Sequence, residues 1–312
     1  MDVLLFTDSG VDDTFALIYA LSHPEINLIG IVVSFGNVSR EFALRNIQFV
    51  LSLAGGDTIA VIVGADRPML GEEPAVFPSI HGEEGLGAFT PPQSIIEPEN
   101  FYLIFELIKR SSEQVTILNL GRLTSLAISF ILHGELLGLV QNIHIMGGAF
   151  LVPGNITPYA EANIYGDSTS AAVVLNHSNI LSNYFYLLNV TEKAVFTPQS
   201  IRALLNDSEK QENSLLIGMF DYYYSYYQKI RPALGGAPLH DLVAVCALVN
   251  PNLYRYIQRN IEIIESGPGK GITIMDVREK PIVNPSHNNF SYIAMGLNIP
   301  EFMREVYTTF HQ

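Results

Sequence analysis

The sequence of 312 residues predicts an α/β fold in one domain, residues 1–312: a doubly wound, mostly parallel open sheet with helices on both faces. Two observations lead to this prediction. Hydrophobic residues make up 48% of the chain and charged residues only 15%, against about 25% charged in an average globular chain, so much of the chain must be buried. Short Val- and Ile-rich runs also alternate with segments of helical spacing, which is typical of a parallel sheet covered by helices.

The first segments set this pattern. Val3–Phe6 is an apolar run too short for a helix, Asp12–Leu21 has helical spacing, and Ile26–Val33 is rich in Ile and Val. A strand, a helix and a strand in this order are typical of the βαβ unit of a parallel sheet. The alternation continues with predicted helices at Glu41–Ala54, Phe101–Ser111, Leu123–His133 and Ser168–Leu175, and with predicted strands at Thr58–Val63, Gln114–Leu118, Ile143–Met146 and Tyr184–Asn189.

Two regions interrupt the alternation. Residues 65–100 are rich in Pro, Gly and Glu and predict a long loop near the strand ends, and residues 209–240 predict a long helix with a cluster of tyrosines. The chain then continues with an apolar helix containing Leu242–Leu248, a strand at Gly271–Val277 and a closing helix at Ile299–Phe310.

The charge balance restricts the partners. The chain carries 31 acidic and 17 basic residues, a net charge of −14, so it repels phosphate backbones and anionic membranes, and a neutral or cationic small molecule is the expected substrate. Residues 136–160 and 168–191 carry no Asp, Glu, Lys or Arg, but polar residues interrupt both, and neither has the roughly 20 apolar residues of a membrane span. The single Cys246 forms no internal disulfide and the first residues lack a basic segment, so we expect a cytoplasmic protein.

Three carboxylates lie between the first strand and its helix. Asp8, Asp12 and Asp13 fall within six residues, and Gly10 between them permits a tight turn. In an open α/β sheet this turn lies at the carboxyl end of the strand, where ligands bind. Such close carboxylates repel one another unless a cation binds, and oxygen ligands suit Ca²⁺ or Mg²⁺. The alternative is that Asp12 and Asp13 only stabilise the N-terminus of the helix.

Two further segments carry polar groups at element ends. Asn155, Glu161 and Asn163 follow the strand Ile143–Met146 and suit a ligand with several hydroxyls, unless they only stabilise a turn. His240 and Asp241 open the apolar helix, where Asp241 suits an N-terminal cap and His240 a general acid. A His-Asp pair alone is weak evidence for catalysis.

Together these segments resemble the inosine–uridine-preferring nucleoside hydrolase family. The resemblance is carried, in order, by Phe6-Thr7-Asp8-Ser9-Gly10-Val11-Asp12-Asp13, Phe35-Gly36-Asn37-Val38, His81 to Gly87, Leu120 to Thr124, Met146-Gly147-Gly148, Asn155 to Asn163 and His240-Asp241. Their order and spacing hold from residue 2 to about residue 280. The resemblance implies a Rossmann-like nucleoside hydrolase fold and the hydrolysis of ribonucleosides to free base and ribose.

The resemblance also assigns roles to residues of this chain. It implies a calcium ion bound by the side chains of Asp8, Asp13 and Asp241 and by the backbone carbonyl of Leu120. It implies contacts to the ribose hydroxyls from Asp12, Asn37, Asn155, Glu161 and Asn163. The metal would lower the pKa of a bound water, Asp8 would accept its proton, and His240 would protonate the leaving base. We expect His81, Tyr223 and Tyr227 to contact the substrate, the two tyrosines from one face of their helix.

The chain departs from the family pattern at a few positions. Phe6 stands where the family has its first Asp, and Arg122 and Ser125 replace Pro and Asn, two changes that we expect to matter less. Phe6 supports an alternative hypothesis, a protein that binds nucleoside or ribose without turnover. A phosphohydrolase with Asp8 as nucleophile is disfavoured because Gly10 stands where it needs a second Asp.

Two properties of the enzyme follow less directly. The chain has no Trp, which excludes a purine site built on stacked indoles and favours a broad or pyrimidine-leaning base preference. We also expect a homo-oligomer, a dimer or a tetramer.

Overall fold

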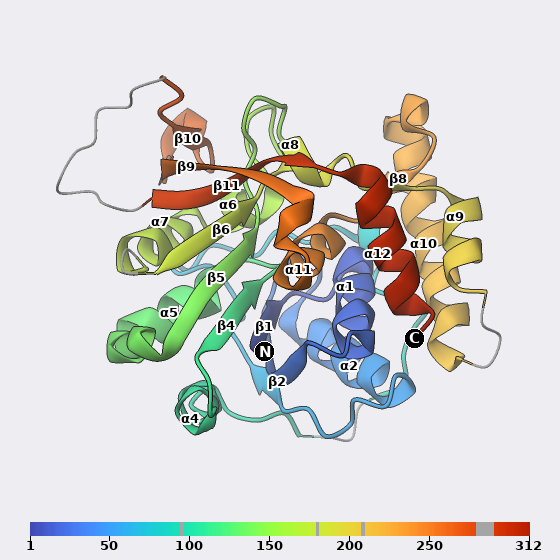
Figure 1. The fold of residues 1–312 in the computed structure, drawn as a ribbon, viewed down its shortest axis with the longest axis horizontal. Helices are drawn as coiled ribbons and strands as arrows, with labels where there is room; N and C mark the ends of the chain where they lie inside the picture. The colour runs from blue at the N-terminus through green and yellow to red at the C-terminus, as the bar shows by residue number, and fades with distance from the viewer. Residues whose placement is uncertain (94–96, 179–180, 207–209, 279–289) are drawn as a thin grey trace.

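The computed structural model describes residues 1–93, 97–178, 181–206, 210–278 and 290–312, whose strands form a nine-stranded sheet and a small two-stranded sheet (Figure 1). In sheet order the strands of the large sheet are β10 (Thr273–Met275), β9 (Tyr254–Ile263), β11 (Phe290–Leu297), β6 (Ser182–Tyr186), β5 (Val140–Met146), β4 (Val115–Asn119), β1 (Asp2–Thr7), β2 (Asn27–Val33) and β3 (Val61–Val63). The small sheet pairs β7 (Val195–Phe196) with β8 (Ala237–Pro238) in antiparallel orientation.

The sheet is parallel from β3 to β11, and only β9 and β10 at one edge run antiparallel to their neighbours. From β1 the chain moves through β2 and β3 toward one edge, and it then returns to β4 on the other side of β1 and continues toward the opposite edge. The strand order therefore reverses between β1 and β4. This confirms the predicted doubly wound, mostly parallel sheet and identifies the crevice in which such sheets bind ligands.

Helices cover both faces of the sheet, because alternate residues of the inner strands point to opposite sides. Val3 and Leu5 of β1 belong to one buried apolar cluster, whereas Leu4 and Phe6 belong to the other. The first cluster is covered by α1 (Val11–Ser22), α2 (Arg40–Leu53), α10 (Gln211–Ile230), α11 (His240–Val249) and α12 (Ile299–Phe310), and the second by α4 (Leu103–Arg110), α5 (Thr124–His133) and α7 (Ser168–His177).

Shorter helices complete the described part of the chain. They are α3 (Pro78–His81), α6 (Ala162–Gly166), α8 (Leu188–Thr191), α9 (Pro198–Leu204) and the 3-10 turns η1 (Gly134–Leu139), η2 (Pro232–Leu234), η3 (Pro251–Leu253) and η4 (Gly267–Gly269). None of the helices in the described residues has the length and apolar character needed to cross a membrane.

Most predicted elements are present, with differences at strand ends. The predicted strand Tyr184–Asn189 is wrong beyond Tyr186, where Leu188–Thr191 forms α8, because a short buried apolar run does not distinguish strand from helix. The predicted strand Thr58–Val63 contains only β3. Neither β9 nor β11 is among the predicted strands. β9 carries Arg255, Arg259 and Glu262 and is only partly buried, so it lacks the continuous apolar run of an inner parallel strand.

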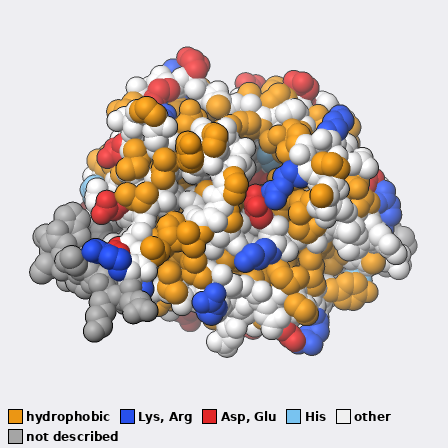
Figure 2. Space-filling model, turned by 90° about the horizontal axis from the view of Figure 1, so that it is seen from above, with side chains coloured by type: hydrophobic (Ala, Val, Ile, Leu, Met, Phe, Trp, Pro, Cys, Tyr) orange, Lys and Arg blue, Asp and Glu red, His pale blue; other side chains and the backbone are white. Residues whose placement is uncertain are grey.

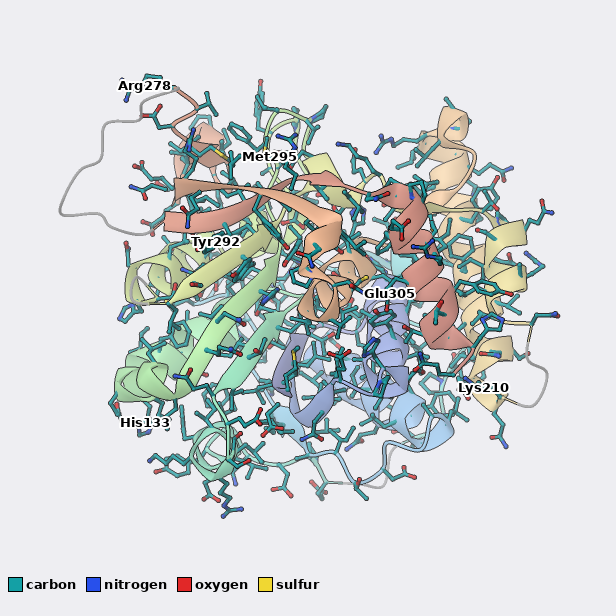
Figure 3. The ribbon with its side chains drawn as sticks, viewed as in Figure 1. His133, Lys210, Arg278, Tyr292, Met295 and Glu305 are labelled. Carbon is teal, nitrogen blue, oxygen red and sulfur yellow. The ribbon has the colours of Figure 1, made fainter. Side chains whose placement is uncertain are left out.

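Stacked aromatic side chains cross the sheet from β5 to β11. His144 of β5 stacks on Tyr184 of β6 with 4.7 Å between ring centroids, and Tyr184 stacks in turn on Tyr292 of β11, labelled in Figure 3. Nδ1 of His144 also lies 2.8 Å from the Tyr186 hydroxyl. Burial lowers the pKa of His144 from 6.5 to about 3, so this imidazole is neutral in the folded protein at neutral pH.

This buried histidine predicts a loss of stability in acid. The unfolded chain binds a proton at His144 below pH 6.5 and the folded chain only near pH 3, so its contribution is complete above pH 6.5 and decreases as the pH falls. As the pH falls from about 6 to about 4, protonation of His144 in the unfolded chain should lower the free energy of unfolding by about 1.4 kcal/mol per pH unit. Urea unfolding of His144→Gln should show a shallower pH dependence than wild type. The same change at exposed His177 is the control, and parallel curves for all three proteins would contradict the prediction.

Candidate active site

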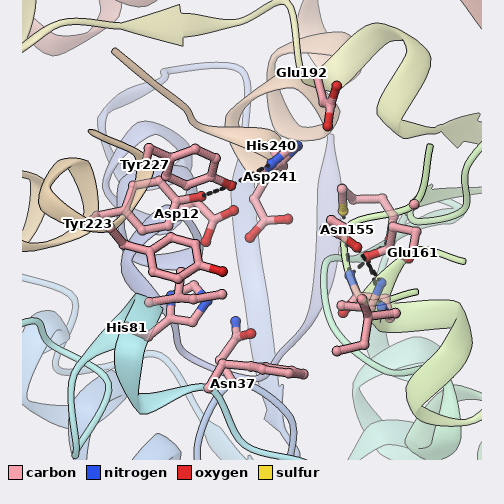
Figure 4. Close-up of a pocket in the computed structure, with 18 of the residues that line it drawn as sticks. Asp12, Asn37, His81, Asn155, Glu161, Glu192, Tyr223, Tyr227, His240 and Asp241 are labelled. Carbon is pink, nitrogen blue, oxygen red and sulfur yellow. Dashed lines mark hydrogen bonds between the residues drawn. The ribbon is translucent and has the colours of Figure 1, made fainter. Parts of the chain in front are cut away.

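A cavity of about 300 Å³ lies at the crevice where the strand order reverses. Residues from the loops after β1, β2, β4 and β5 line it, together with α3, α10 and the start of α11 (Figure 4). Seen from above, this face of the molecule has a hollow in which a histidine side chain is visible, with an acidic and a basic side chain beside it (Figure 2). A volume of this size, with a few converging polar groups, is typical of a small-molecule site.

The structure brings almost all predicted site residues to this cavity. Those that line it are Asp12, Asn37, His81, Leu120, Asn155, Glu161, Asn163, Tyr223, Tyr227, His240 and Asp241. Asp8 and Asp13 are not among the lining residues and lie behind Asn37, whose side-chain amide donates to both carboxylates at 3.0 and 2.9 Å.

Asp8 is completely buried in a space that two glycines leave open. A Cβ atom at Gly36 would lie 1.7 Å from Oδ2 of Asp8, and one at Gly121 would lie 2.9 Å from its Cγ. The same Oδ2 accepts a hydrogen bond of 2.5 Å from Nη1 of Arg122, in an ion pair with both side chains buried. Burial and the charge of Asp13 raise the pKa of Asp8 well above its ordinary value, while Arg122 acts in the opposite direction.

Asp13 holds the turn between β1 and α1 in place. Its carboxylate accepts hydrogen bonds from the Thr7 hydroxyl at 2.5 Å and from the backbone amide of Gly10 at 2.8 Å. It therefore serves as an N-terminal residue of α1, as one of the alternatives for this motif suggested. The same contacts also orient the carboxylate toward its acidic neighbours.

Three carboxylates form the group that suits a metal ion. Asp12, Asp13 and Asp241 are buried, and each offers an oxygen within 4.8 Å of the other two. The pKa of Asp12 is raised to about 8 by burial and by the charge of Asp13. The pKa of Asp241 is also raised well above its ordinary value, by burial and then by the charges of Asp12 and Asp13. Because like charges oppose ionisation here, a divalent cation with oxygen ligands fits this group.

The opposite wall of the cavity carries the polar residues that follow β5. Glu161 caps α6, and its carboxylate accepts from the backbone amides of Asn163, Gly148 and Ile164 at 2.8, 2.9 and 3.1 Å. The side-chain amide of Asn163 donates to the Leu120 carbonyl at 2.7 Å. Asn155 accepts from the Ala162 amide at 2.9 Å. These contacts hold the wall rigidly, so its remaining polar atoms are already oriented for a ligand.

Aromatic and histidine side chains form the other end of the cavity. Nδ1 of His81 accepts from the Val11 amide at 3.1 Å, and burial lowers its pKa to about 3, so its other ring nitrogen carries the proton. The Tyr223 hydroxyl donates to that of Tyr227 at 3.3 Å, which lies 3.4 Å from Nε2 of His240. This end combines apolar rings with polar tips, as a planar heterocycle requires.

His240 is held at both ring nitrogens, because its Nδ1 lies 2.8 Å from the hydroxyl of Thr191. Burial, and then the charge of Arg231, lower its pKa to about 4. At neutral pH the ring is therefore neutral.

Several lining residues are absent from the sequence predictions. Glu192 and Arg231 form an ion pair of 2.8 Å at the cavity. Thr191, which contacts His240 from α8, was also not predicted. Two departures from the family pattern lie in different surroundings. Phe6 packs in the apolar cluster under α4 and α5, whereas Arg122 contacts Asp8. Ser125 only bonds to Ser34 and the Ala65 amide.

Comparisons with known proteins find similar chains with related names. The structure matches a purine-preferring ribonucleoside hydrolase from Gardnerella vaginalis with a TM-score of 0.90 and 30% identity, over 99% of this chain and 98% of that one. Uridine nucleosidase 1 of Arabidopsis thaliana is 33% identical over 88% of this chain and 81% of its own. The pyrimidine-specific ribonucleoside hydrolase RihA of Escherichia coli O8 is 32% identical over 88% of both chains.

Fold, cavity and relatives together define a hydrolase that acts on N-glycosyl compounds. The family model described as inosine-uridine preferring nucleoside hydrolase matches residues 3–304. The chain therefore belongs to the inosine-uridine preferring nucleoside hydrolase family, which confirms the resemblance found in the sequence.

Proposed function

We propose that this protein is a calcium-dependent enzyme that hydrolyses the N-glycosidic bond of ribonucleosides to free base and ribose. The observation that carries the proposal is the layout of one cavity. It has the carboxylates Asp12, Asp13 and Asp241 at one side, the amide and carboxylate wall of Asn155 to Asn163 opposite, and tyrosines with His240 at the end. A ribose between the first two sets would extend its base toward the third.

Asp13 and Asp241 are the proposed metal ligands that fit most directly, with Asp12 beside them. Asp8 and the Leu120 carbonyl, the other two ligands implied by the resemblance, have hydrogen-bond partners in Arg122 and Asn163. Calcium, when bound, supplies positive charge that lowers the pKa of a coordinated water.

The protein's own groups supply the remaining chemistry. Hydrolysis of this bond passes through a transition state with oxocarbenium character, as in glycosidases. In our proposal Asp8 accepts the proton of the attacking water, and its ion pair with Arg122 favours the carboxylate form that this role requires. Asn37, Glu161 and Asn163 hold the ribose, and His240 with Tyr227 delivers a proton to the leaving base.

Activity measurements on a panel of nucleosides test the proposal. Purified protein should release base from ribonucleosides and lose this activity on treatment with a chelator. Adding calcium to the treated protein should restore the activity, and treated protein without added calcium should stay inactive. Nucleotide phosphate esters should not react. Binding of nucleosides without any base release would contradict the proposal and favour the alternative, a protein that binds nucleoside or ribose without turnover. The position of Phe6 in a buried apolar cluster does not support that alternative.

We further propose a broad or pyrimidine-leaning base preference. Among the relatives, one is named for uridine and one for pyrimidines, whereas the Gardnerella enzyme is named for purines. The tyrosines and histidines at the end of this cavity offer both hydrogen bonds and ring faces. Uridine and cytidine should therefore be cleaved at least as well as inosine. Strong cleavage of inosine and guanosine with negligible cleavage of uridine and cytidine would show the preference to be wrong.

The proposal includes a homo-oligomer, a dimer or tetramer, working in the cytoplasm. The unpaired, buried Cys246 is compatible with a reducing compartment. Light scattering of the purified chain would measure the subunit number, and a monomer at micromolar concentration would contradict the oligomer.

A further inference from the structure

Arg122 occupies a prepared position beside the acidic groups. Nη1 donates to Oδ2 of Asp8 at 2.5 Å and to Oδ1 of Asn163 at 3.0 Å. The guanidinium lies over the Phe77 ring, 5.4 Å from its centroid. Gly166 gives it room, since a Cβ atom there would lie 2.7 Å from Nε. The side chain is only 1% exposed, so it is a fixed part of the site rather than a surface group that swings in.

These contacts use the atoms that a metal would need. Both carboxylate oxygens of Asp8 accept hydrogen bonds, Oδ2 from the charged Arg122 and Oδ1 from Asn37. The oxygens of Asp13 also accept hydrogen bonds, but from the neutral groups of Thr7, Gly10 and Asn37, which do not compete with a cation by charge. The Leu120 carbonyl accepts from Asn163, whose other side-chain atom is held by Arg122. Arg122 therefore organises the environment of two of the four ligands that the resemblance implies.

Charge leads to the same conclusion. A guanidinium is always protonated and pairs strongly with a carboxylate in a buried site. If Asp8 coordinated calcium, its carboxylate would contact both the calcium ion and the Arg122 guanidinium. These two positive charges would then lie close enough to repel each other strongly. Among the described interactions, none joins Arg122 to Asp12, Asp13 or Asp241. One carboxylate oxygen from each of these three residues lies within 4.8 Å of the other two, so together they can bind one cation.

We propose that Arg122 is an internal cation that pairs with Asp8 and keeps it out of the metal's coordination shell, so that calcium is bound by Asp12, Asp13 and Asp241. Arg122 is a positioning residue: it orients Asp8 and Asn163, and it weakens calcium binding compared with a site in which Asp8 is free. The inference rests on the proposed function for the identity of the metal, but not on turnover.

Calcium binding to the metal-stripped protein, measured by titration calorimetry without substrate, tests the proposal. Arg122→Gln keeps hydrogen-bond donors near Asp8 but removes the charge, and it should tighten calcium binding by roughly tenfold or more because Asp8 becomes available and a like charge is gone. Arg122→Lys should bind calcium about as wild type does, since the charge stays. A variant that only disturbed the fold would weaken binding.

Two comparisons isolate the role of Asp8. The double variant Arg122→Gln with Asp8→Asn should lose the gain in affinity, since the gain depends on that carboxylate. Arg231→Met also removes one positive charge at the cavity, but Arg231 pairs with Glu192 and not with Asp8. This variant should therefore change calcium affinity much less than Arg122→Gln. Unchanged or weaker binding by Arg122→Gln, or a gain that survives the loss of Asp8, would overturn the proposal.

A structure of the wild-type chain with calcium examines the same point without any substitution. Arg122 should still contact Asp8, and the ion should lie on Asp12, Asp13 and Asp241. An Asp8 oxygen within about 2.6 Å of the ion, the limit of a calcium–oxygen bond, would overturn the inference. Absence of base release from any nucleoside would instead refute the proposed function, whatever the calcium affinities.

Discussion

Asp13→Ala is expected to abolish ribonucleoside hydrolysis and calcium binding together. Asp13 offers a ligand oxygen to the acidic group and also holds the turn after β1 through Thr7 and Gly10. A bound metal contributes several kcal/mol of transition-state stabilisation, so kcat should fall by at least about 10³-fold. Steady-state kinetics on uridine and inosine, with calorimetric titration of calcium, would measure both effects.

Controls separate this effect from unfolding. Asp13→Asn keeps the size of the side chain and should lose activity to a similar extent, since it removes the charge that attracts the cation. Asp66→Ala removes an exposed carboxylate and should leave activity unchanged. An Asp13→Ala protein with a normal thermal transition, normal calcium affinity and more than about a tenth of wild-type kcat would contradict the proposed role.

His240→Ala is expected to lower kcat by roughly 10²–10⁴-fold, the contribution of a positioned general acid. The loss should appear in kcat rather than KM, because proton donation is made mainly in the transition state. Calcium binding should stay nearly intact, since the ring of His240, which the substitution removes, is bonded to Thr191 and Tyr227. The effect should be much smaller for p-nitrophenyl riboside, whose leaving group needs no proton.

The Tyr227 hydroxyl lies 3.4 Å from Nε2 of His240, so we expect Tyr227 to take part in proton delivery to the leaving base. Tyr227→Phe keeps the ring and removes the hydroxyl, so it should lower kcat in the same direction for natural nucleosides while sparing p-nitrophenyl riboside. If His240→Ala reduces the rates on inosine, uridine and p-nitrophenyl riboside equally, His240 has a function other than proton delivery.

Local sequence patterns predicted much of the fold and the site. Runs with period two and segments with period 3.6 identify the inner strands and helices because burial on one or both faces imposes those periods. Polar residues directly after such strands, among them Asp8 and Asn155, belong to the cavity because parallel strands end at the same edge of a sheet. The strands β9 and β11 and the end of β6 were missed or misplaced. β9 carries charged residues in place of a continuous apolar run, and the short apolar run after β6 fits a strand and a helix equally.

The sequence by itself determined the fold class, the family and the set of residues that meet at the end of the sheet. Only the tertiary structure decided their partners: Arg122 lies on Asp8, Phe6 points into the apolar cluster under α4 and α5, and Thr191 reaches His240. The physical reason is that a side chain's direction depends on the strand register and on how a loop leaves the sheet. Residues 114 positions apart, such as Asp8 and Arg122, come into contact only when β1 and β4 lie side by side.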